Sequence, residues 1–160
     1  MKRASLLILA LFVLSFPVLA QQLQLIGLDG KAVAISPADF KAMPHHAVTV
    51  VNGHTKAQEK YDGVLLSDLL AKVGAPMGKD LRGPAMLTYV KASASDNYNV
   101  LLALAEVDPG MRANEIIVAD TMDGKPLDAH NGPLKLVVPG DIHPARSVRM
   151  LTTVSIYRAP

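Results

Sequence analysis

The chain has 160 residues, half of them hydrophobic and 19% charged, and it contains no cysteine. The absence of cysteine excludes disulfides, thiolate nucleophiles, iron–sulfur clusters and cysteine-ligated metals. Lys2 and Arg3 account for the whole formal net charge of +2, so the chain from Gln21 onward is electrically balanced. No basic face is required, and we expect no nucleic-acid partner.

Residues 1–20 have the three zones of a secretory signal peptide. Lys2 and Arg3 form a positive start, residues 6–18 form an apolar stretch, and Ala20 precedes the predicted cleavage site. A membrane anchor is the alternative, but the apolar stretch is shorter than the about 20 residues that a span needs. We therefore expect a periplasmic or secreted protein with one domain over residues 21–160.

Dense and evenly spaced turn signals predict a β-rich α+β fold, in which short helices accompany a mostly antiparallel sheet. Residues 23–26 and 32–35 are expected to form a hairpin with a turn at Gly30. A short helix follows, which Ser36 is expected to cap and Pro44 to stop.

The middle and end of the chain add further short elements. Residues 47–51 are β-branched and predict a buried strand, with residues 54–61 as its hairpin partner. Ser67 is expected to cap a helix over residues 68–73. Additional strands are predicted at residues 86–92, 98–102, 115–119, 134–138 and 152–157.

Common catalytic signatures are missing from the sequence: it has no P-loop, HExxH zinc motif, EF-hand loop or nucleophile elbow. His45, His46 and His54 suggest a metal site, since imidazole is a common ligand. Adjacent histidines on a strand point to opposite faces, however, so we predict no metal ligands. Because the catalytic motifs are missing, we also predict no catalytic residues. A Ser/His/Asp hydrolase can be assembled only from scattered polar residues, which is a very weak signal.

Two stretches of the chain resemble a known family. Residues 61–70, YDGVLLSDLL, resemble the pattern W-x-G-V-x-L-x-x-L-L, and later come GKPL, HNGPLKLVVPG and RSVRML within residues 124–151. This order and spacing is similar to the molybdopterin-binding domain of the sulfite oxidase family, over roughly residues 47–156. The resemblance implies that family's β-rich mixed sheet with short helices.

The resemblance also implies a cysteine that ligates molybdenum after the strand equivalent to residues 47–51. This chain lacks it, and Asn52 is the best candidate for the equivalent position. A neutral amide is a poor substitute for a thiolate. The chain resembles small exported members that bind a reduced pterin and report it to a membrane-bound signalling protein. The resemblance therefore implies a non-metallated pterin as ligand, with molybdopterin as a second possibility.

A pterin is flat and needs a slot with hydrogen-bond donors and acceptors, and arginine can both stack on a ring and donate in a planar fork. The residues expected to contact the ligand are Arg146, Arg149, Asn131, His130, Asp141, His143, Ser93, Ser95, Asn97 and Asn52. The plainer alternatives are surface ion pairs of the arginines with Asp141 or Asp128, a turn at residues 130–132, and a hairpin loop at residues 93–97.

Three functions follow from these patterns. The first is an exported pterin sensor that signals to a membrane partner. The second is a molybdopterin-dependent oxidoreductase or its accessory subunit, and the third is an interaction module without a ligand. A bound metal would favour the second, and convergence of Arg146, Arg149 and Asn131 on a concave site would argue against the third.

Overall fold

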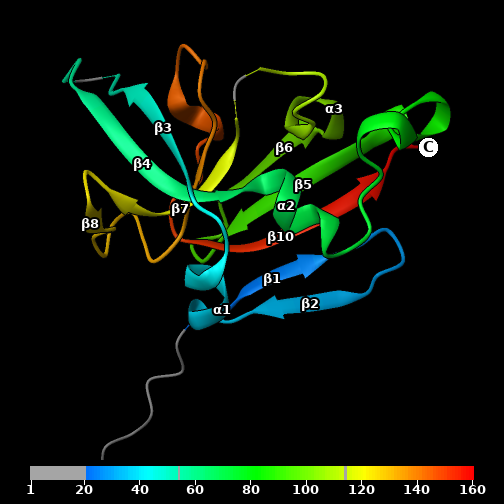
Figure 1. Ribbon diagram of the computed structural model, residues 1–160, viewed down its shortest axis with the longest axis horizontal. Coiled ribbons are helices and arrows are strands. Elements are labelled where there is room, and N and C mark those ends of the chain that lie inside the picture. Colours follow the sequence, from blue (N-terminus) through cyan, green and yellow to red (C-terminus); the bar gives the residue numbers. More distant parts are fainter. Residues whose placement is uncertain (1–20, 54, 114) are drawn as a thin grey trace, which may run out of the picture.

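The computed structural model describes residues 21–53, 55–113 and 115–160. The predicted signal peptide, residues 1–20, lies outside the described residues. The described chain forms two five-stranded sheets with a few short helices, as expected for an α+β fold (Figure 1). Within the described ranges, no helix has both the length and the apolar character that a membrane span requires.

The first sheet has the strand order β2-β1-β10-β5-β6. β1 pairs with β10 in parallel, and the other pairs are antiparallel. Figure 1 shows the C-terminal strand β10 lying between β1 and β5. The strand bounds are β1 Leu23–Ile26, β2 Ala32–Ile35, β5 Thr88–Ala94, β6 Asn99–Ala103 and β10 Leu151–Arg158.

The second sheet has the order β3-β4-β7-β8, and β9 also pairs with β7. Gly63 lets β4 and β7 approach each other closely, because a Cβ at this position would lie 2.0 Å from the Val118 carbonyl oxygen. The strand bounds are β3 His46–Val51, β4 Gln58–Leu65, β7 Ile117–Met122, β8 Lys125–Pro126 and β9 Lys135–Val137.

The helices are short, and only one begins as predicted. Ser36 caps α1, because its hydroxyl accepts a hydrogen bond from the Asp39 N–H. Ser67 does not cap α2: it lies inside the helix, because β4 runs directly into α2 and the Leu66 N–H donates to the Ile116 carbonyl instead. The bounds are α1 Pro37–Ala42, α2 Leu66–Ala71, α3 Leu104–Val107, η1 Gly78–Asp80, η2 Gly83–Leu87 and η3 Pro144–Arg146.

The predicted buried strand at residues 47–51 is a strand, but it is not buried. β3 pairs with β4 and forms the edge of the second sheet, and its residues alternate between half-buried and exposed. Val51 at its end is 61% exposed. The β-branched composition therefore suits a half-covered pleated surface rather than a core.

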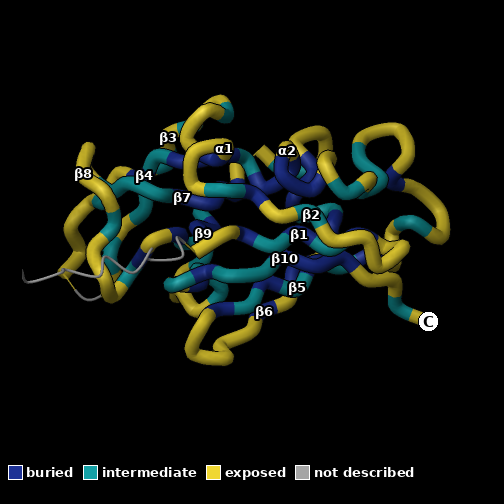
Figure 2. The backbone as a smooth tube through the Cα atoms, turned by 90° about the horizontal axis from the view of Figure 1, so that it is seen from below, coloured by how far each residue is buried: buried dark blue, intermediate teal, exposed yellow. Residues whose placement is uncertain are grey.

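The two faces of the second sheet have different roles. Alternate residues such as Val64 and Val118 point into the main core, which the two sheets share. The opposite face carries a smaller apolar cluster of Tyr61, Ile117, Ala119 and Val137. Figure 2 shows the buried positions concentrated along the central strands and the exposed ones in the connecting loops. The smaller cluster forms the base of the site described next.

Candidate functional site

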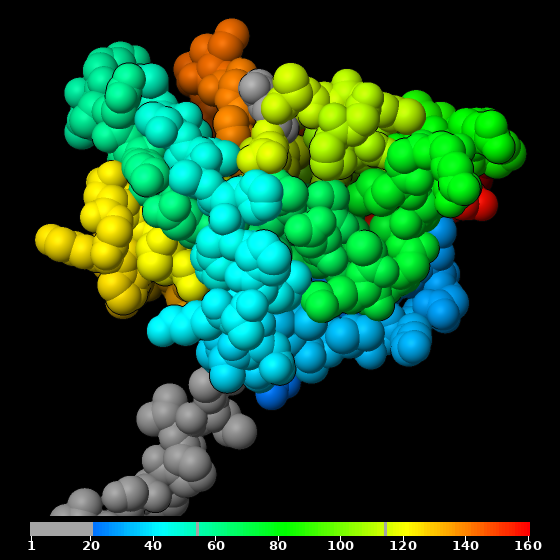
Figure 3. Space-filling model, in the orientation of Figure 1, coloured from blue at the N-terminus to red at the C-terminus, as the bar shows by residue number. Residues whose placement is uncertain are grey.

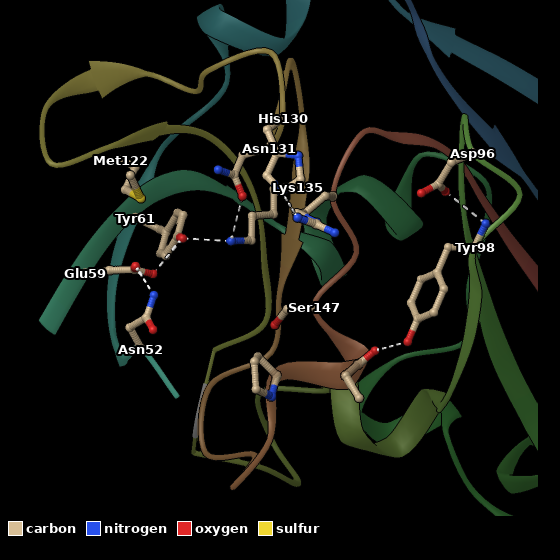
Figure 4. A pocket seen from close by; sticks show the side chains of 13 residues that line it. Asn52, Glu59, Tyr61, Asp96, Tyr98, Met122, His130, Asn131, Lys135 and Ser147 are labelled. Atoms are coloured by element: carbon tan, nitrogen blue, oxygen red, sulfur yellow. Dashed lines mark hydrogen bonds between the residues drawn. The ribbon is translucent and has the colours of Figure 1, made fainter. Parts of the chain in front are cut away.

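A cavity of about 610 Å³ opens beside the smaller apolar cluster (Figure 4). Its volume lies in the range of small-molecule sites. The second sheet and the segment after β3 form one wall, and the tip of the β5–β6 hairpin forms the other. Its lining residues are Asn52, Glu59, Tyr61, Asp96, Tyr98, Met122, His130, Asn131, Lys135, Pro144, Ala145, Ser147 and Arg149.

A chain of hydrogen bonds runs along the sheet wall. Lys135 Nζ donates to the Tyr61 hydroxyl at 2.7 Å, and that hydroxyl donates to Glu59 Oε2 at 2.9 Å. Asn52 Nδ2 donates to Glu59 Oε1 at 2.7 Å. The Lys135 ammonium also lies 4.5 Å from the centre of the Tyr61 ring. The wall thus offers an ordered cation, a hydroxyl, a carboxylate and an amide to one cavity.

Strand alternation explains why these side chains meet. Glu59 and Tyr61 are two residues apart on β4 and share a face, and Tyr61 pairs in register with Met122 of β7. On β9, Lys135 shares this face with Val137, whereas Leu136 between them is buried in the main core. The apolar residues of this face pack together, and the polar ones line the cavity.

Burial changes the ionisation of two groups in this wall. The pKa of Tyr61 is raised above its usual value, first by burial and then by the hydrogen bond to Glu59. The pKa of Lys135 is lowered, because burial disfavours its ammonium. The two shifts have the same main cause: both groups lie in a poorly solvated place, where electrostatic interactions are stronger than in water.

The opposite wall is the β5–β6 hairpin tip. The Tyr98 hydroxyl donates to the Ala145 carbonyl at 2.6 Å, and the Tyr98 N–H donates to Asp96 Oδ1 at 3.0 Å. Figure 4 shows the Tyr98 ring across the opening from Lys135. The bond between Tyr98 and Ala145 joins the hairpin tip to η3, so these two segments form one continuous wall.

The rim of the cavity is formed by His130, Asn131 and Arg149. Arg149 contacts His130 through its guanidinium, and Asn131 Oδ1 accepts a hydrogen bond from Lys135 Nζ at 3.3 Å. The Asn131 side chain and backbone donate to Asp128, which lowers the pKa of that carboxyl. Three predicted contact residues, His130, Asn131 and Arg149, thus lie together at one concave site, which Asn52 also lines.

Arg146 has a different position. Its guanidinium forms a two-pronged pair with Asp141, at 2.9 and 2.7 Å, and its Nη1 donates to Glu106 at 2.9 Å. The arginine lowers the pKa of the Asp141 carboxyl. In the described chain it is absent from the lining of the cavity. Arg146 therefore follows the plainer alternative from the sequence, an ion pair with Asp141, rather than the predicted ligand contact.

A second cavity of about 480 Å³ adjoins the first and shares six lining residues with it: Asn52, Glu59, Tyr61, Lys135, Pro144 and Ser147. Asp141 lines this second cavity. Among the described residues, neither cavity is lined by His143, which is exposed before η3.

The predicted contacts at the end of β5 and in the loop to β6, which are Ser93, Ser95 and Asn97, lie apart from the cavity lining. The Ser93 hydroxyl donates to Asn99, and the Asn97 carbonyl accepts from the same side chain. Asn97 has a φ of 69°, a turn conformation that asparagine tolerates. Ser95 is exposed. The hairpin tip turns Asp96 and Tyr98 toward the cavity instead.

Several lining residues were absent from the sequence prediction, above all Glu59, Tyr61, Lys135 and Tyr98. Tyr61 lies in the YDGVLLSDLL stretch, but there it was treated as part of the fold pattern. Lys135 is the single charged residue in an apolar strand, which is a usable signal once the strand is known to have one open face.

The histidines considered as metal ligands point to different partners. His45 Nε2 lies 3.6 Å from Asp120, and His46 Nδ1 lies 3.3 Å from Glu115. His54 lies outside the described residues. Within residues 21–53, 55–113 and 115–160, no three His, Asp or Glu side chains gather as a metal site would require.

Comparison with known proteins agrees with this fold. No curated protein matches the chain. A solved structure, the sulfane dehydrogenase SoxCD from Paracoccus pantotrophus, shares the fold with a TM-score of 0.66 at 21% identity. The match covers 86% of this chain but only 38% of the SoxCD chain. Residues 16–160 match the family model described as the oxidoreductase molybdopterin binding domain. The chain therefore belongs to the oxidoreductase molybdopterin binding domain family.

Proposed function

We propose that the protein is a periplasmic binding protein for a reduced, non-metallated pterin. One observation carries this proposal: a donor-rich cavity is retained while the chain has no cysteine to ligate a metal. Asn52, the candidate for the cysteine position, lines the cavity and donates to Glu59. Its amide nitrogen donates to Glu59 and its amide oxygen accepts from the Thr55 N–H, and neither atom is the thiolate that a soft metal prefers.

The lining residues fit the organic part of the family cofactor. Lys135 and Arg149 supply donors for a ring carbonyl, ring nitrogens or a phosphate. Glu59 and Asp96 supply acceptors for an amino group and a ring N–H. The exposed ring of Tyr98 supplies flat apolar surface on one wall. These are the elements that a flat, polar heterocycle needs.

The same residues do not fit the metal. A molybdenum centre would supply the redox chemistry of the sulfite oxidase type, and the family resemblance assigns its thiolate ligand to a cysteine that this chain lacks. No step of a reaction is therefore assigned to these residues. The proposed role of the cavity is to bind and orient the ligand.

We further propose that ligand binding is reported to a membrane-bound signalling protein. The predicted signal peptide would deliver the chain to the periplasm. The loop between β9 and β10 contributes Ser147 and Arg149 to the cavity and also carries Ile142, which is 91% exposed. Ile142 lies at the second cavity, which adjoins the proposed ligand site. A segment that lines the ligand site and also exposes a large apolar side chain suits a reporting role.

The alternative is a molybdopterin-dependent oxidoreductase or its accessory subunit, which the family membership favours. Because the chain spans 38% of the length of the SoxCD chain, an accessory role would involve further domains or subunits.

The test is mass spectrometry of small molecules released by denaturing the protein, purified from a periplasm under reducing conditions, with molybdenum measured on the same sample. A stoichiometric pterin without molybdenum supports the sensor. Stoichiometric molybdenum contradicts it and supports the oxidoreductase. If neither is found, a tetrahydropterin is titrated anaerobically by calorimetry, and absence of binding overturns the proposal in favour of an interaction module.

The reporting role is tested separately. The wild-type chain is immobilised with and without tetrahydropterin and exposed to detergent-solubilised membranes. We expect one membrane protein to be retained in a pterin-dependent manner, and Ile142→Asp to abolish its retention without changing pterin affinity. Equal retention with and without pterin contradicts the reporting role but leaves pterin binding intact.

A further inference from the structure

The second cavity, of about 480 Å³, extends the proposed pterin site along β3. Because the two cavities share six lining residues, one ligand can reach from the first into the second. The second cavity adds Val50, Gly53 and Lys56 to this shared lining. Figure 3 shows the two segments that border it, the blue-green tip of the β3–β4 hairpin and the orange segment after β9, projecting from the same side of the molecule.

Part of this added surface is apolar. Val50 pairs with Glu59 in the β3–β4 register, so both side chains point to the same face of the second sheet. Val50 is half-buried, and Pro144 of the facing segment is exposed. The first cavity, by contrast, has the polar rim described above. A ligand that fills both cavities therefore needs a polar end and an apolar continuation.

The second cavity is narrow where Gly53 faces Pro144. Gly53 lies in the turn after β3, and a Cβ at this position would lie 3.8 Å from Pro144 Cδ. Because glycine has no side chain, the space between this turn and η3 stays open, and a larger residue would fill it. A flat group fits such a space better than a branched one.

An exposed lysine completes the lining. Lys56 lies in the hairpin turn with a φ of 60°, and its Nζ donates to the Gly53 carbonyl at 2.8 Å. This bond uses one of the three donors of the ammonium, and in the described part of the chain Lys56 forms no ion pair. The Asp141 carboxylate, which also lines this cavity, accepts from Arg146 instead. Lys56 thus has donors left for an anionic group.

We propose that the ligand is a pterin whose ring carries an extension with a flat apolar part and a terminal carboxylate, and that the second cavity holds this extension. The inference rests on the proposed function, because the pterin ring would occupy the first cavity. The apolar part would pack between Val50 and Pro144, and the carboxylate would accept from Lys56 Nζ. Ile142, which is 91% exposed, would remain available to a partner.

The test is anaerobic calorimetry of the wild-type protein with two ligands that share the reduced ring. Tetrahydrofolate carries an aminobenzoyl group and a glutamate on that ring, whereas 6-methyltetrahydropterin carries a methyl group. We expect tetrahydrofolate to bind at least tenfold more tightly, because it adds apolar contact and a charge-assisted hydrogen bond.

The outcomes separate this inference from the proposed function. Equal or weaker binding of tetrahydrofolate overturns the extension and leaves the pterin site standing. Tighter binding of tetrahydroneopterin phosphate, whose side chain is polar throughout, also overturns the apolar extension. Binding of none of these ligands overturns the proposed function and this inference with it.

Two variants then locate the extension. Lys56→Gln should weaken tetrahydrofolate binding at least fivefold, and the exposed Lys79→Gln is its matched control. Gly53→Leu should have the same effect by filling the second cavity. Both variants should keep their affinity for 6-methyltetrahydropterin, which shows in the same experiment that the chain is folded. Wild-type affinity for tetrahydrofolate in both variants overturns the proposal, as does an equal loss of affinity for both ligands.

Discussion

Arg146 and Arg149 are three residues apart, yet they belong to different parts of the molecule. Arg146 is surrounded by the carboxylates of Asp141 and Glu106 and joins the loop after β9 to α3. Arg149 lines the cavity and contacts His130 at its rim. In the first region Arg146 and Arg112 face the carboxylates of Asp141 and Glu106, which makes it an ion-pair anchor. The second region presents cationic donors to a cavity.

The difference teaches that an arginine's role is set by the acceptors already within its reach. A guanidinium has five donors, and Arg146 directs both edges of its fork at carboxylates of its own chain. We therefore assign loop stability to Arg146 and ligand contact to Arg149 and Lys135. Each prediction below tests one side of this division.

The largest effect is expected at the cavity. Lys135→Met should weaken binding of a tetrahydropterin by about 10–100-fold, because hydrogen bonds to charged groups contribute about 1.5–3 kcal/mol. Stability should change little, since methionine removes the cost of burying an ammonium. Anaerobic calorimetry measures the affinity, with the exposed Lys79→Met as control. Unchanged affinity in Lys135→Met would remove Lys135 from the proposed binding site.

The next effect is expected at the anchor. Arg146→Ala should lower the free energy of unfolding by about 2 kcal/mol, because Asp141 and Glu106 lose their shared partner. Pterin affinity should fall no more than about threefold, since the arginine lies outside the cavity lining. Urea unfolding and calorimetry measure the two quantities, with Arg82→Ala as a surface control. A large loss of affinity at unchanged stability would reverse the assignment.

Arg149→Ala should give the opposite pattern. We expect affinity for the tetrahydropterin to fall about tenfold, because one charge-assisted contact is lost. The free energy of unfolding should change by less than about 0.5 kcal/mol, as for most surface substitutions. The same two measurements apply. If Arg146→Ala and Arg149→Ala behave alike, the comparison between the two regions fails.

Local signals were sufficient to predict much of the fold. The hairpin at Gly30 and the Ser36 cap depend on neighbouring residues, and both are present. Ser67 failed as a cap because the preceding strand runs directly into the helix, which is a long-range effect. The bulge at Asp120 likewise depends on the pairing with β4, which no local pattern specifies.

The candidate site could be predicted only in part for the same reason. Asn52, Asn131 and Arg149 follow from the family resemblance, because they lie in or beside its motifs. Tyr61 lies on β4 and Lys135 lies on β9, and these two strands do not pair with each other. Both pair with β7, so the contact between the two side chains depends on the register of each strand on β7. The sequence alone does not specify that register.

The smallest expected effect is a difference between the two regions in how the free energy of unfolding depends on pH. Arg146 lowers the pKa of Asp141, so this carboxyl contributes stability that is present above its unfolded pKa of about 3.8 and lost as pH falls through the lower folded value. Urea unfolding between pH 2 and 7 should show wild type and Arg146→Ala converging below about pH 4. Arg149→Ala should remain parallel to wild type, because Arg149 is not paired with this carboxyl. A constant gap between wild type and Arg146→Ala at every pH would mean that Arg146 stabilises the loop by packing rather than by charge.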